Sequence, residues 1–301
     1  MKRYGDLIGD GGSNVLEQVQ AQARRLEGRL ADVSSIVAVM SGKGGVGKSV
    51  LTVCIADALA LAGRKVGIVD ADINGASVVR MTGVGDQKVV YVPSGAVPAT
   101  SRLGVKVMGI DLFVDDKTTP VLWKAPTQKD GFTWRGMMEM SAVREFISDT
   151  DWGSLDTLLV DLPPGSSSLP NLVDVLPKFS GAVIVTLPSG VSRLIVERSA
   201  KMARDVVQAP VLGLIENCSY HVCPHCGEAE ALYPDGDAEP LAEEHGIPFL
   251  GRIPFDPWMA QSSDRGVSYM QMHRDRPAAD AIDRISKAID AASTSLSQAL
   301  N

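Results

Sequence analysis

Residues 36–49 read IVAVMSGKGGVGKS, and this stretch decides the fold. Its first six residues form a short apolar run rich in β-branched side chains, which predicts a buried strand over 36–41. From Gly42 to Ser49 the chain matches G-x-x-x-x-G-K-[ST], a pattern whose glycines let backbone N–H groups converge on phosphate oxygens. A predicted helix follows over 48–62 and adds the positive end of its dipole. The stretch therefore predicts a phosphate-binding loop between a strand and a helix.

The residues of this loop have separate expected roles. Lys48 would reach the β- and γ-phosphates of a nucleotide, and Ser49 would bind Mg²⁺. The alternative, a Gly-rich turn without a ligand, is disfavoured by the strand and the helix on either side. The predicted nucleotide-binding residues are Gly42, Lys43, Gly44, Gly45, Val46, Gly47, Lys48 and Ser49.

Outward from the loop, apolar strands alternate with helical patterns. Strands are predicted over 66–70, 105–109, 157–161, 182–186, 211–216 and 249–253, and further helices over 137–149, 191–207 and 238–245. Strands that are apolar almost throughout and separated by helices predict a doubly wound, mostly parallel α/β sheet that binds ligands at its carboxyl edge. We expect one main domain over 36–301, preceded by a loop and helix extension over 1–35.

Lys43, directly after the first glycine, is the most informative residue of the loop. A lysine there makes the chain resemble the signature-lysine subclass of P-loop ATPases, which includes the MinD, ParA and nitrogenase iron protein relatives. In that subclass two subunits face each other across two nucleotides, and this lysine reaches the phosphates bound by the partner. The resemblance implies a homodimer in which Lys43 is catalytic; the alternative is an ordinary solvated lysine. Val50 departs from the threonine that is usual there, which removes a hydroxyl contact to the α-phosphate.

Three aspartates follow predicted strands. Asp161 ends the strand over 157–161 and would hold Mg²⁺ through water. Asp70 and Asp72 lie at the end of the strand over 66–70, in a segment that resembles switch I of the subclass. The resemblance implies that Asp72 orients the attacking water and that Asp70 lies nearer the metal. One aspartate at a strand end is commonly a loop cap, but two such segments beside a phosphate loop favour Mg²⁺ binding.

The predicted base is adenine. Asn217 follows the strand over 211–216, where relatives of the subclass place an adenine-contacting asparagine. Residues 127–130, TQKD, have the letters of a guanine-binding motif in the wrong spacing. ATP is therefore favoured over GTP.

Cys223 and Cys226 form one C-x-x-C pair, in a loop over 218–227. The two-residue spacer lets two thiolates converge on one metal. One pair supplies two ligands, whereas zinc and [4Fe–4S] centres usually take four, and a dimer meets that number with two facing pairs. Three interpretations stay open: a [4Fe–4S] cluster shared between two subunits, Zn²⁺ at the same place, or a redox dithiol without metal. Cys218 is expected to pack near the strand end, with a third-ligand role as its alternative, and Cys54 to lie in the core.

Several motifs together resemble the Mrp-type (ApbC/Nbp) iron–sulfur cluster carrier ATPases over most of 36–260. They are SGKGGVGKS at 41–49, VDADINGAS at 69–77, WRG at 134–136, DWGSLDTLLVDLPPG at 151–165, GLIENCSYHVCPHCG at 213–227 and LAEEHGIPFLGRIPFDP at 241–257. The resemblance implies a homodimer that binds and slowly hydrolyses ATP, takes a cluster from a donor scaffold and transfers it to apo-proteins. The chain departs from the family at 166–168, where Thr-Gly-Asp is common, and by about eleven extra residues around 123–133.

The composition disfavours several other classes of function. Among 301 residues, 45% are hydrophobic and 22% are charged, and the net charge is −7. This acidic balance disfavours binding to nucleic acid or to a membrane through a basic surface. No apolar run approaches the roughly 18 residues of a membrane helix, and the N-terminus lacks the apolar region of a signal peptide, so we expect a cytoplasmic protein. A MinD- or ParA-like switch and a zinc-bridged regulatory dimer are the alternative functions.

Overall fold

The computed structural model describes residues 24–114, 131–165, 167–174, 176, 178–233 and 238–300. Residues 24–30 are helical, which agrees with the expected N-terminal helix as far as that helix is described. Most of the extra segment around 123–133 lies outside the described residues, and so does Ser166. The division of the chain at residue 35 stays a prediction.

The secondary structure alternates in the predicted way. The strands are β1 Val33–Met40, β2 Val66–Asp70, β3 Val90–Val92, β4 Gly95–Val97, β5 Ala99–Thr100, β6 Lys106–Met108, β7 Leu155–Asp161, β8 Gly181–Thr186, β9 Val211–Glu216, β10 Tyr220–Val222, β11 Ala229–Ala231 and β12 Phe249–Arg252. The helices are α3 Lys48–Leu61, α4 Val78–Met81, α5 Gly131–Ser148, α6 Ser168–Val173, α7 Gly190–Lys201, α8 Glu239–Glu244, α9 Pro257–Arg265, α10 Tyr269–Met272 and α11 Pro277–Leu300, with a 3-10 turn at Ile110–Leu112 and a π turn at Met202–Val206.

Eight of the described strands form one sheet, in the order β12-β9-β8-β1-β7-β2-β6-β5. All neighbours are parallel except β5 and β6. The strands β2 and β8 are buried along their whole length, because apolar side chains point to both faces and helices cover both. The predicted doubly wound α/β fold is confirmed.

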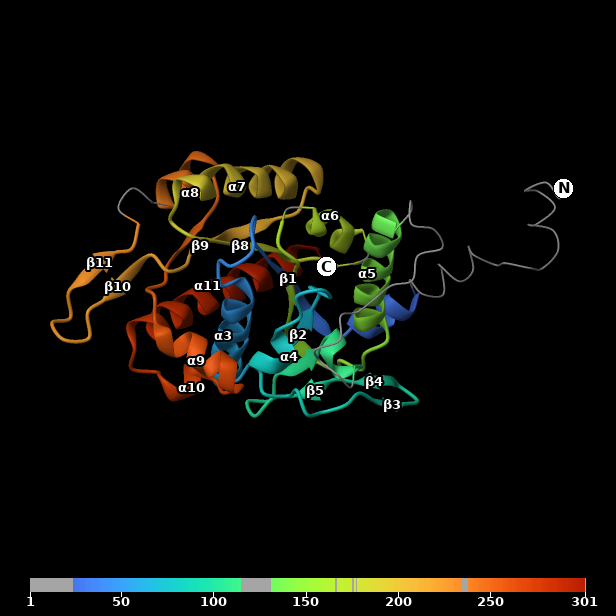
Figure 1. Cartoon of the computed structure of the whole chain (residues 1–301). Coiled ribbons are helices and arrows are strands. Elements are labelled where there is room, and N and C mark those ends of the chain that lie inside the picture. Colours follow the sequence, from blue (N-terminus) through green and yellow to red (C-terminus); the bar gives the residue numbers. More distant parts are fainter. Residues whose placement is uncertain are drawn as a thin grey trace, which may run out of the picture.

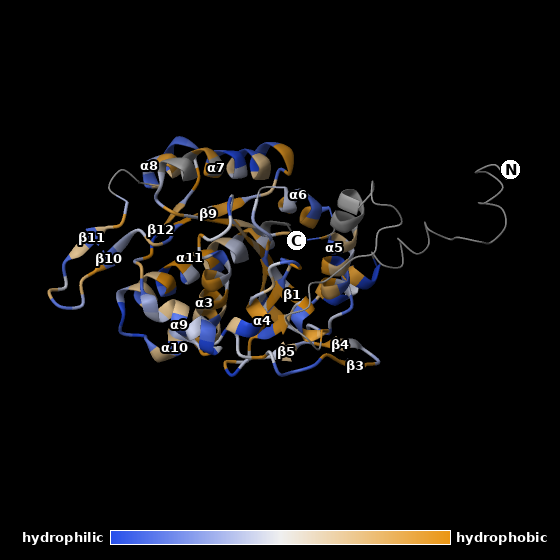
Figure 2. Ribbon diagram, in the orientation of Figure 1, coloured by the Kyte–Doolittle hydropathy of each residue, from blue (hydrophilic) through white to orange (hydrophobic). Residues whose placement is uncertain are grey.

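The helices pack in layers on the sheet (Figure 1). On one face α3 and α11 contact each other, and α11 also contacts β1, β9 and β12. The apolar stripe of α11, with Ile282, Ile285 and Ile289 one turn apart, is buried in this contact. The helix α5 contacts β2 and lies across the sheet from α3 (Figure 1). Hydrophobic residues gather in the strands and in α3, as Figure 2 shows.

Two small hairpins lie outside the large sheet. The pair β3–β4 and the pair β10–β11 are both antiparallel. The hairpin β10–β11 projects from the body of the molecule (Figure 1), and it carries Cys223 and Cys226 between its strands. We call residues 220–231 the cysteine hairpin.

The helices of the described residues include none that is both long enough and apolar enough to span a bilayer.

Candidate functional site

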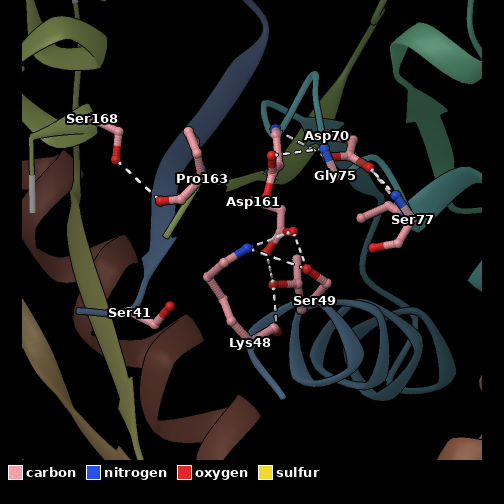
Figure 3. Close-up of polar contacts among 12 residues, drawn as sticks. Ser41, Lys48, Ser49, Asp70, Gly75, Ser77, Asp161, Pro163 and Ser168 are labelled. Carbon is pink, nitrogen blue, oxygen red and sulfur yellow. Dashed lines mark hydrogen bonds and ion pairs between the residues drawn. The ribbon is translucent and has the colours of Figure 1, made fainter. Parts of the chain in front are cut away.

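The carboxyl ends of three neighbouring strands bring the predicted nucleotide residues together. The strand β1 leads into the phosphate loop, β7 ends at Asp161, and β2 ends at Asp70. Asp70 and Asp161 are paired in the register of β2 and β7, so their carboxylates are neighbours on one edge of the sheet. Figure 3 shows the side chains of Lys48 and Ser49 pointing from α3 toward Asp161.

The backbone of the phosphate loop has the shape that a phosphate site needs. Gly45 and Gly47 have φ values of 79° and 84°, in the left-handed region that favours glycine. Gly47 is also the N-cap of α3, so the first free N–H groups of that helix face the loop. The carbonyl of Ser41 accepts a hydrogen bond from the N–H of Gly165 at 2.8 Å, which joins the loop to the segment after β7. This geometry fits a bound phosphate chain.

Lys48, Ser49 and Asp161 form a tight buried cluster. The Lys48 Nζ lies 2.8 Å from Asp161 Oδ2, and the two side chains are 6% and 0% exposed. The Ser49 hydroxyl donates to the same carboxylate oxygen at 2.6 Å. The neighbouring hydroxyl and carboxylate are oxygen donors of the kind that Mg²⁺ prefers, so these residues fit the predicted magnesium site.

Thr52 is a fourth member of this cluster that the sequence analysis did not name. Its hydroxyl donates to the other carboxylate oxygen of Asp161 at 2.7 Å, and its side chain is fully buried. Thr52 lies four residues after Lys48, so both occupy one face of α3. That spacing was visible in the sequence, but the contact between Thr52 and a carboxylate 109 residues away was not.

Asp70 is held by backbone groups of the segment that follows it. Its Oδ2 accepts hydrogen bonds from the N–H groups of Ser77 and Val78 at 2.9 and 3.0 Å, at the start of α4. Burial, and then the charge of Asp161, raises the pKa of Asp70 to about 7. Asp70 thus links the cluster at Asp161 to α4.

Asp72 and Lys43 lie in the loops on either side of this cluster. The Asp72 carboxylate turns back on its own loop, where it accepts a hydrogen bond from the N–H of Gly75 at 3.0 Å. Lys43 is half-buried within the phosphate loop, and its carbonyl accepts a hydrogen bond from the Ser41 hydroxyl. The catalytic roles expected for these two residues therefore stay predictions.

Asn217 contacts the phosphate loop itself. It follows β9, and its Nδ2 donates to the carbonyl of Val46 at 2.8 Å. A Cβ on Gly47 would lie 2.4 Å from this nitrogen, so only glycine leaves room for the contact. Asn217 is thus beside the predicted nucleotide site, and in this structure its side chain fixes the loop; the predicted contact to adenine remains a prediction.

The cysteine hairpin brings its two thiols together. The backbone N–H groups of Cys226 and His225, and then the Cys226 thiol, hydrogen-bond to Cys223 and lower the pKa of its thiol. The turn is closed by the bond from the Gly227 N–H to the Cys223 carbonyl at 2.9 Å. Cys226 is exposed and Cys223 is half-buried. Cys218 is also half-buried, and there burial raises the pKa of the thiol. Among the described residues, no group of three or more His, Cys, Asp and Glu side chains is placed to hold a metal ion.

The residues on either side of the hairpin are hydrogen-bonded to the end of β9. Glu216, which is 1% exposed, accepts hydrogen bonds from the Ser219 hydroxyl and, at 2.6 Å, from the N–H of Ala238. Cys218, which lies between Glu216 and Ser219 in the chain, has a φ of 51°, an uncommon left-handed conformation for a residue with a side chain. The chain therefore turns sharply from the edge of the large sheet into the cysteine hairpin.

The comparisons with known proteins agree with this geometry. The family described as "ParA: NUBPL iron-transfer P-loop NTPase" matches residues 32–290. An "Iron-sulfur cluster carrier protein" of Saccharolobus solfataricus is 38% identical over 264 residues, which are 87% of this chain and 85% of the relative. The "Cytosolic Fe-S cluster assembly factor NUBP2" of Bos taurus is 39% identical over 267 residues, 87% of this chain and 94% of the relative.

Solved structures support the same assignment. A nucleotide-binding protein of Archaeoglobus fulgidus, in complex with ADP, is 34% identical, with a TM-score of 0.70 over 86% of this chain and 95% of its own. MinD of Aquifex aeolicus is 22% identical, with a TM-score of 0.57 over 84% of this chain and 95% of its own, and shows the shared fold. The chain is thus a P-loop NTPase with a MinD-like fold. It belongs to the NUBPL iron-transfer P-loop NTPase family.

Proposed function

We propose that this protein is an ATP-hydrolysing iron–sulfur cluster carrier that acts as a homodimer. Its cargo is a [4Fe–4S] cluster held between two copies, received from a donor scaffold and delivered to apo-proteins. The names of the relatives, an iron–sulfur cluster carrier and a cytosolic assembly factor, support the carrier function and a cytoplasmic location. The observation that carries the proposal is a pair of accessible thiols on a projecting hairpin, attached to a P-loop NTPase core.

The ATPase roles follow from the cluster of charges at the sheet edge. Lys48 stabilises the charge that develops on the transferred phosphoryl group, and Lys43 adds a second positive charge from the partner subunit. Asp72 orients the attacking water from the loop after β2, where its carboxylate also accepts the N–H of Gly75. Ser49, Asp70 and Asp161 hold Mg²⁺, which supplies charge neutralisation at the phosphates.

The nucleotide is held mainly by the backbone. The N–H groups from Gly42 to Ser49 bind the phosphates, and Asn217, whose amide donates to the loop at Val46, contacts the adenine. Lys48, whose Nζ lies 2.8 Å from Asp161, is placed at the start of α3, where it can also reach the phosphates.

The cysteine hairpin supplies half of the cluster site. Each copy offers Cys223 and Cys226, and a [4Fe–4S] centre takes four thiolates, so two facing hairpins complete the ligand set. The lowered pKa of Cys223 favours the thiolate, which is the form that binds iron. Because Cys226 is exposed, a cluster bound there is accessible to a client protein.

Anaerobic reconstitution with iron and sulfide tests the proposal. We expect about four irons per dimer and a brown chromophore, the content of one [4Fe–4S] centre. Cys223→Ala and Cys226→Ala should each abolish both signals. Cys54→Ala is the matched control, because that thiol is buried in α3, and it should keep the cluster.

Other metal contents would contradict this reading. Tightly bound zinc with no iron uptake would support the zinc-bridged regulatory dimer instead. Four irons on an isolated monomer would show that one chain supplies all the ligands, and the two-copy site would be wrong.

A further inference from the structure

A direct contact between two helix ends joins the nucleotide site to the region of the cysteine hairpin. Gly83 lies just after α4 and Gly266 caps α9, with φ values of 70° and 62°. A Cβ on Gly83 would lie 2.2 Å from the Gly266 carbonyl oxygen, and one on Gly266 would lie 2.7 Å from the Gly83 Cα. The two helices therefore meet backbone against backbone.

On one side, this contact leads to the nucleotide site. The helix α4 starts at the two N–H groups that Asp70 holds, and it ends two residues before Gly83. Asp70 in turn is the register neighbour of Asp161, the carboxylate paired with Lys48. A change in the pairing of Asp161 therefore acts on Asp70 and, through its two hydrogen bonds, on the position of α4.

On the other side, the contact leads to the cysteine hairpin. The helix α9 starts at Asp256, whose carboxylate accepts the N–H of Trp258 at 3.0 Å. The preceding residue, Phe255, donates its N–H to the carbonyl of Tyr220 in β10 at 2.7 Å. Directly after the end of β10 at Val222 comes the turn that begins at Cys223.

We infer that α9 transmits the nucleotide state from α4 to the cysteine hairpin, with Gly83 and Gly266 as the positioning residues at the contact. Exposed side chains absorb small shifts by changing rotamer, but two backbones in contact have no such freedom. The helix α9 is nine residues, about 13 Å, long and moves as a rigid rod between its two ends. This inference rests on the proposed function, since it explains how ATP would change the hold on a cluster.

The cysteine hairpin has a second attachment one residue earlier in the chain, at Ser219. Asn217 binds the phosphate loop through Val46, and the adjacent Glu216 binds the Ser219 hydroxyl. A nucleotide that moves the phosphate loop and α4 by different amounts would thus displace the two attachments of β10 relative to each other. Such a displacement changes the position and the exposure of the thiols.

The test measures thiol alkylation in the full-length, metal-free protein. Iodoacetamide labelling of Cys223 and Cys226 is followed peptide by peptide, with and without Mg²⁺ and a non-hydrolysable ATP analogue. In the unsubstituted protein we expect the nucleotide to change the labelling rate by about fivefold or more, the lower range of measured allosteric couplings. In Gly266→Ala we expect nucleotide binding to persist and the ratio of the two rates to fall to near one.

Gly246→Ala is the matched control. Gly246 follows α8 with a φ of 61°, but nothing lies within 4 Å of the position of its Cβ. An alanine at this position has the same left-handed strain but touches no other element. The ratio of labelling rates with and without nucleotide in Gly246→Ala should therefore match that of the unsubstituted protein. Equal loss in Gly246→Ala and Gly266→Ala would assign the effect to strain and overturn the inference.

If Gly266→Ala does not fold, a second variant and a second measurement still test the inference. Gly83→Ala removes the same contact from the other side, and hydrogen exchange in the unsubstituted protein should show altered protection in α9 when the analogue binds. Nucleotide-dependent labelling without any change in α9, or an unchanged ratio in Gly83→Ala, would refute the inference. Iron uptake is measured on the same proteins: its absence would refute the proposed function, whereas the labelling result needs no iron.

Discussion

The buried pair of Lys48 and Asp161 gives the sharpest prediction for stability. Replacing Lys48 with Met leaves the Asp161 carboxylate, which is 0% exposed, without a cation and beside the carboxylate of Asp70. Breaking a buried pair by removing one partner typically costs about 3–5 kcal/mol. For a domain of this size that loss corresponds to a fall in Tm of roughly 10 °C.

The reverse substitution should cost less. Asp161→Asn keeps an oxygen and an amide where Ser49 and Thr52 now donate, and Lys48 has a long stem and 6% exposure with which to reach water. We expect a loss of about 1–3 kcal/mol, from hydrogen bonds that are weakened or lost. The double variant Lys48→Met/Asp161→Asn contains neither charge, so its loss should be at least about 2 kcal/mol smaller than the sum of the two single losses.

Urea denaturation of the nucleotide-free protein in the presence of a chelator measures this cycle. Lys287→Met is the control, because Lys287 is paired with Asp283 at 2.5 Å on the exposed face of α11. This substitution should leave the midpoint of urea denaturation unchanged. If the losses of Lys48→Met and Asp161→Asn add to within about 0.5 kcal/mol in the double variant, the two charges do not stabilise each other and the reasoning is wrong.

Three further predictions concern other parts of the chain. Burial raises the pKa of Asp57 to about 6, above its unfolded value of about 3.9. The contribution of Asp57 to stability is therefore present below about pH 4 and is lost as the pH rises through about 6. Asp57→Asn should be more stable than the unsubstituted protein at pH 8, by up to about 3 kcal/mol in thermal melts, and equal melts at pH 8 would contradict this. Lys43→Ala should bind nucleotide but lose ATP-dependent dimerisation and most hydrolysis, measured by light scattering and phosphate release; normal turnover by a monomer would refute the role of Lys43. Asn217→Ala leaves the Val46 carbonyl without its donor and should weaken ATP binding about fivefold or more in calorimetry, whereas unchanged affinity would show that this bond does not shape the loop.

Most of the sheet was predictable because its strands coincide with short apolar runs in the sequence. The segments 66–70 and 211–216 form strands with the predicted bounds, and the other predicted strands differ by a few residues. The two-residue edge strand β5 was not predicted. The first strand starts at Val33 instead of 36, since Ser34 and Ser35 interrupt the apolar run but Val33 and Ser35 still pair with β7. The meeting of Asp70 and Asp161 also followed from sequence, because parallel strands end at one edge of the sheet.

The cysteine hairpin was not predictable in the same way. Its strands have three residues each, and the residues of β11 are all exposed, so neither strand has a buried face that would produce alternation. The bond from Asn217 to Val46 joins positions 171 residues apart, and the contact of Gly83 with Gly266 joins two helix ends that no local pattern relates. These features depend on tertiary packing, which the spacing of residues along the chain does not encode locally.

The position of β1 at the middle of the sheet has a consequence for synthesis on the ribosome. Val33 of β1 pairs with Leu155 of β7, 122 residues further along the chain. At about 5–20 residues per second, β1 waits roughly 6–24 s for this neighbour, and we expect its apolar side chains to need protection during that time. The thiols at 223 and 226 are translated after Asp161, so the carboxylate that pairs with Lys48 is made before either cysteine. A nascent chain can therefore form the pair of Lys48 and Asp161 before the thiols of the cysteine hairpin exist.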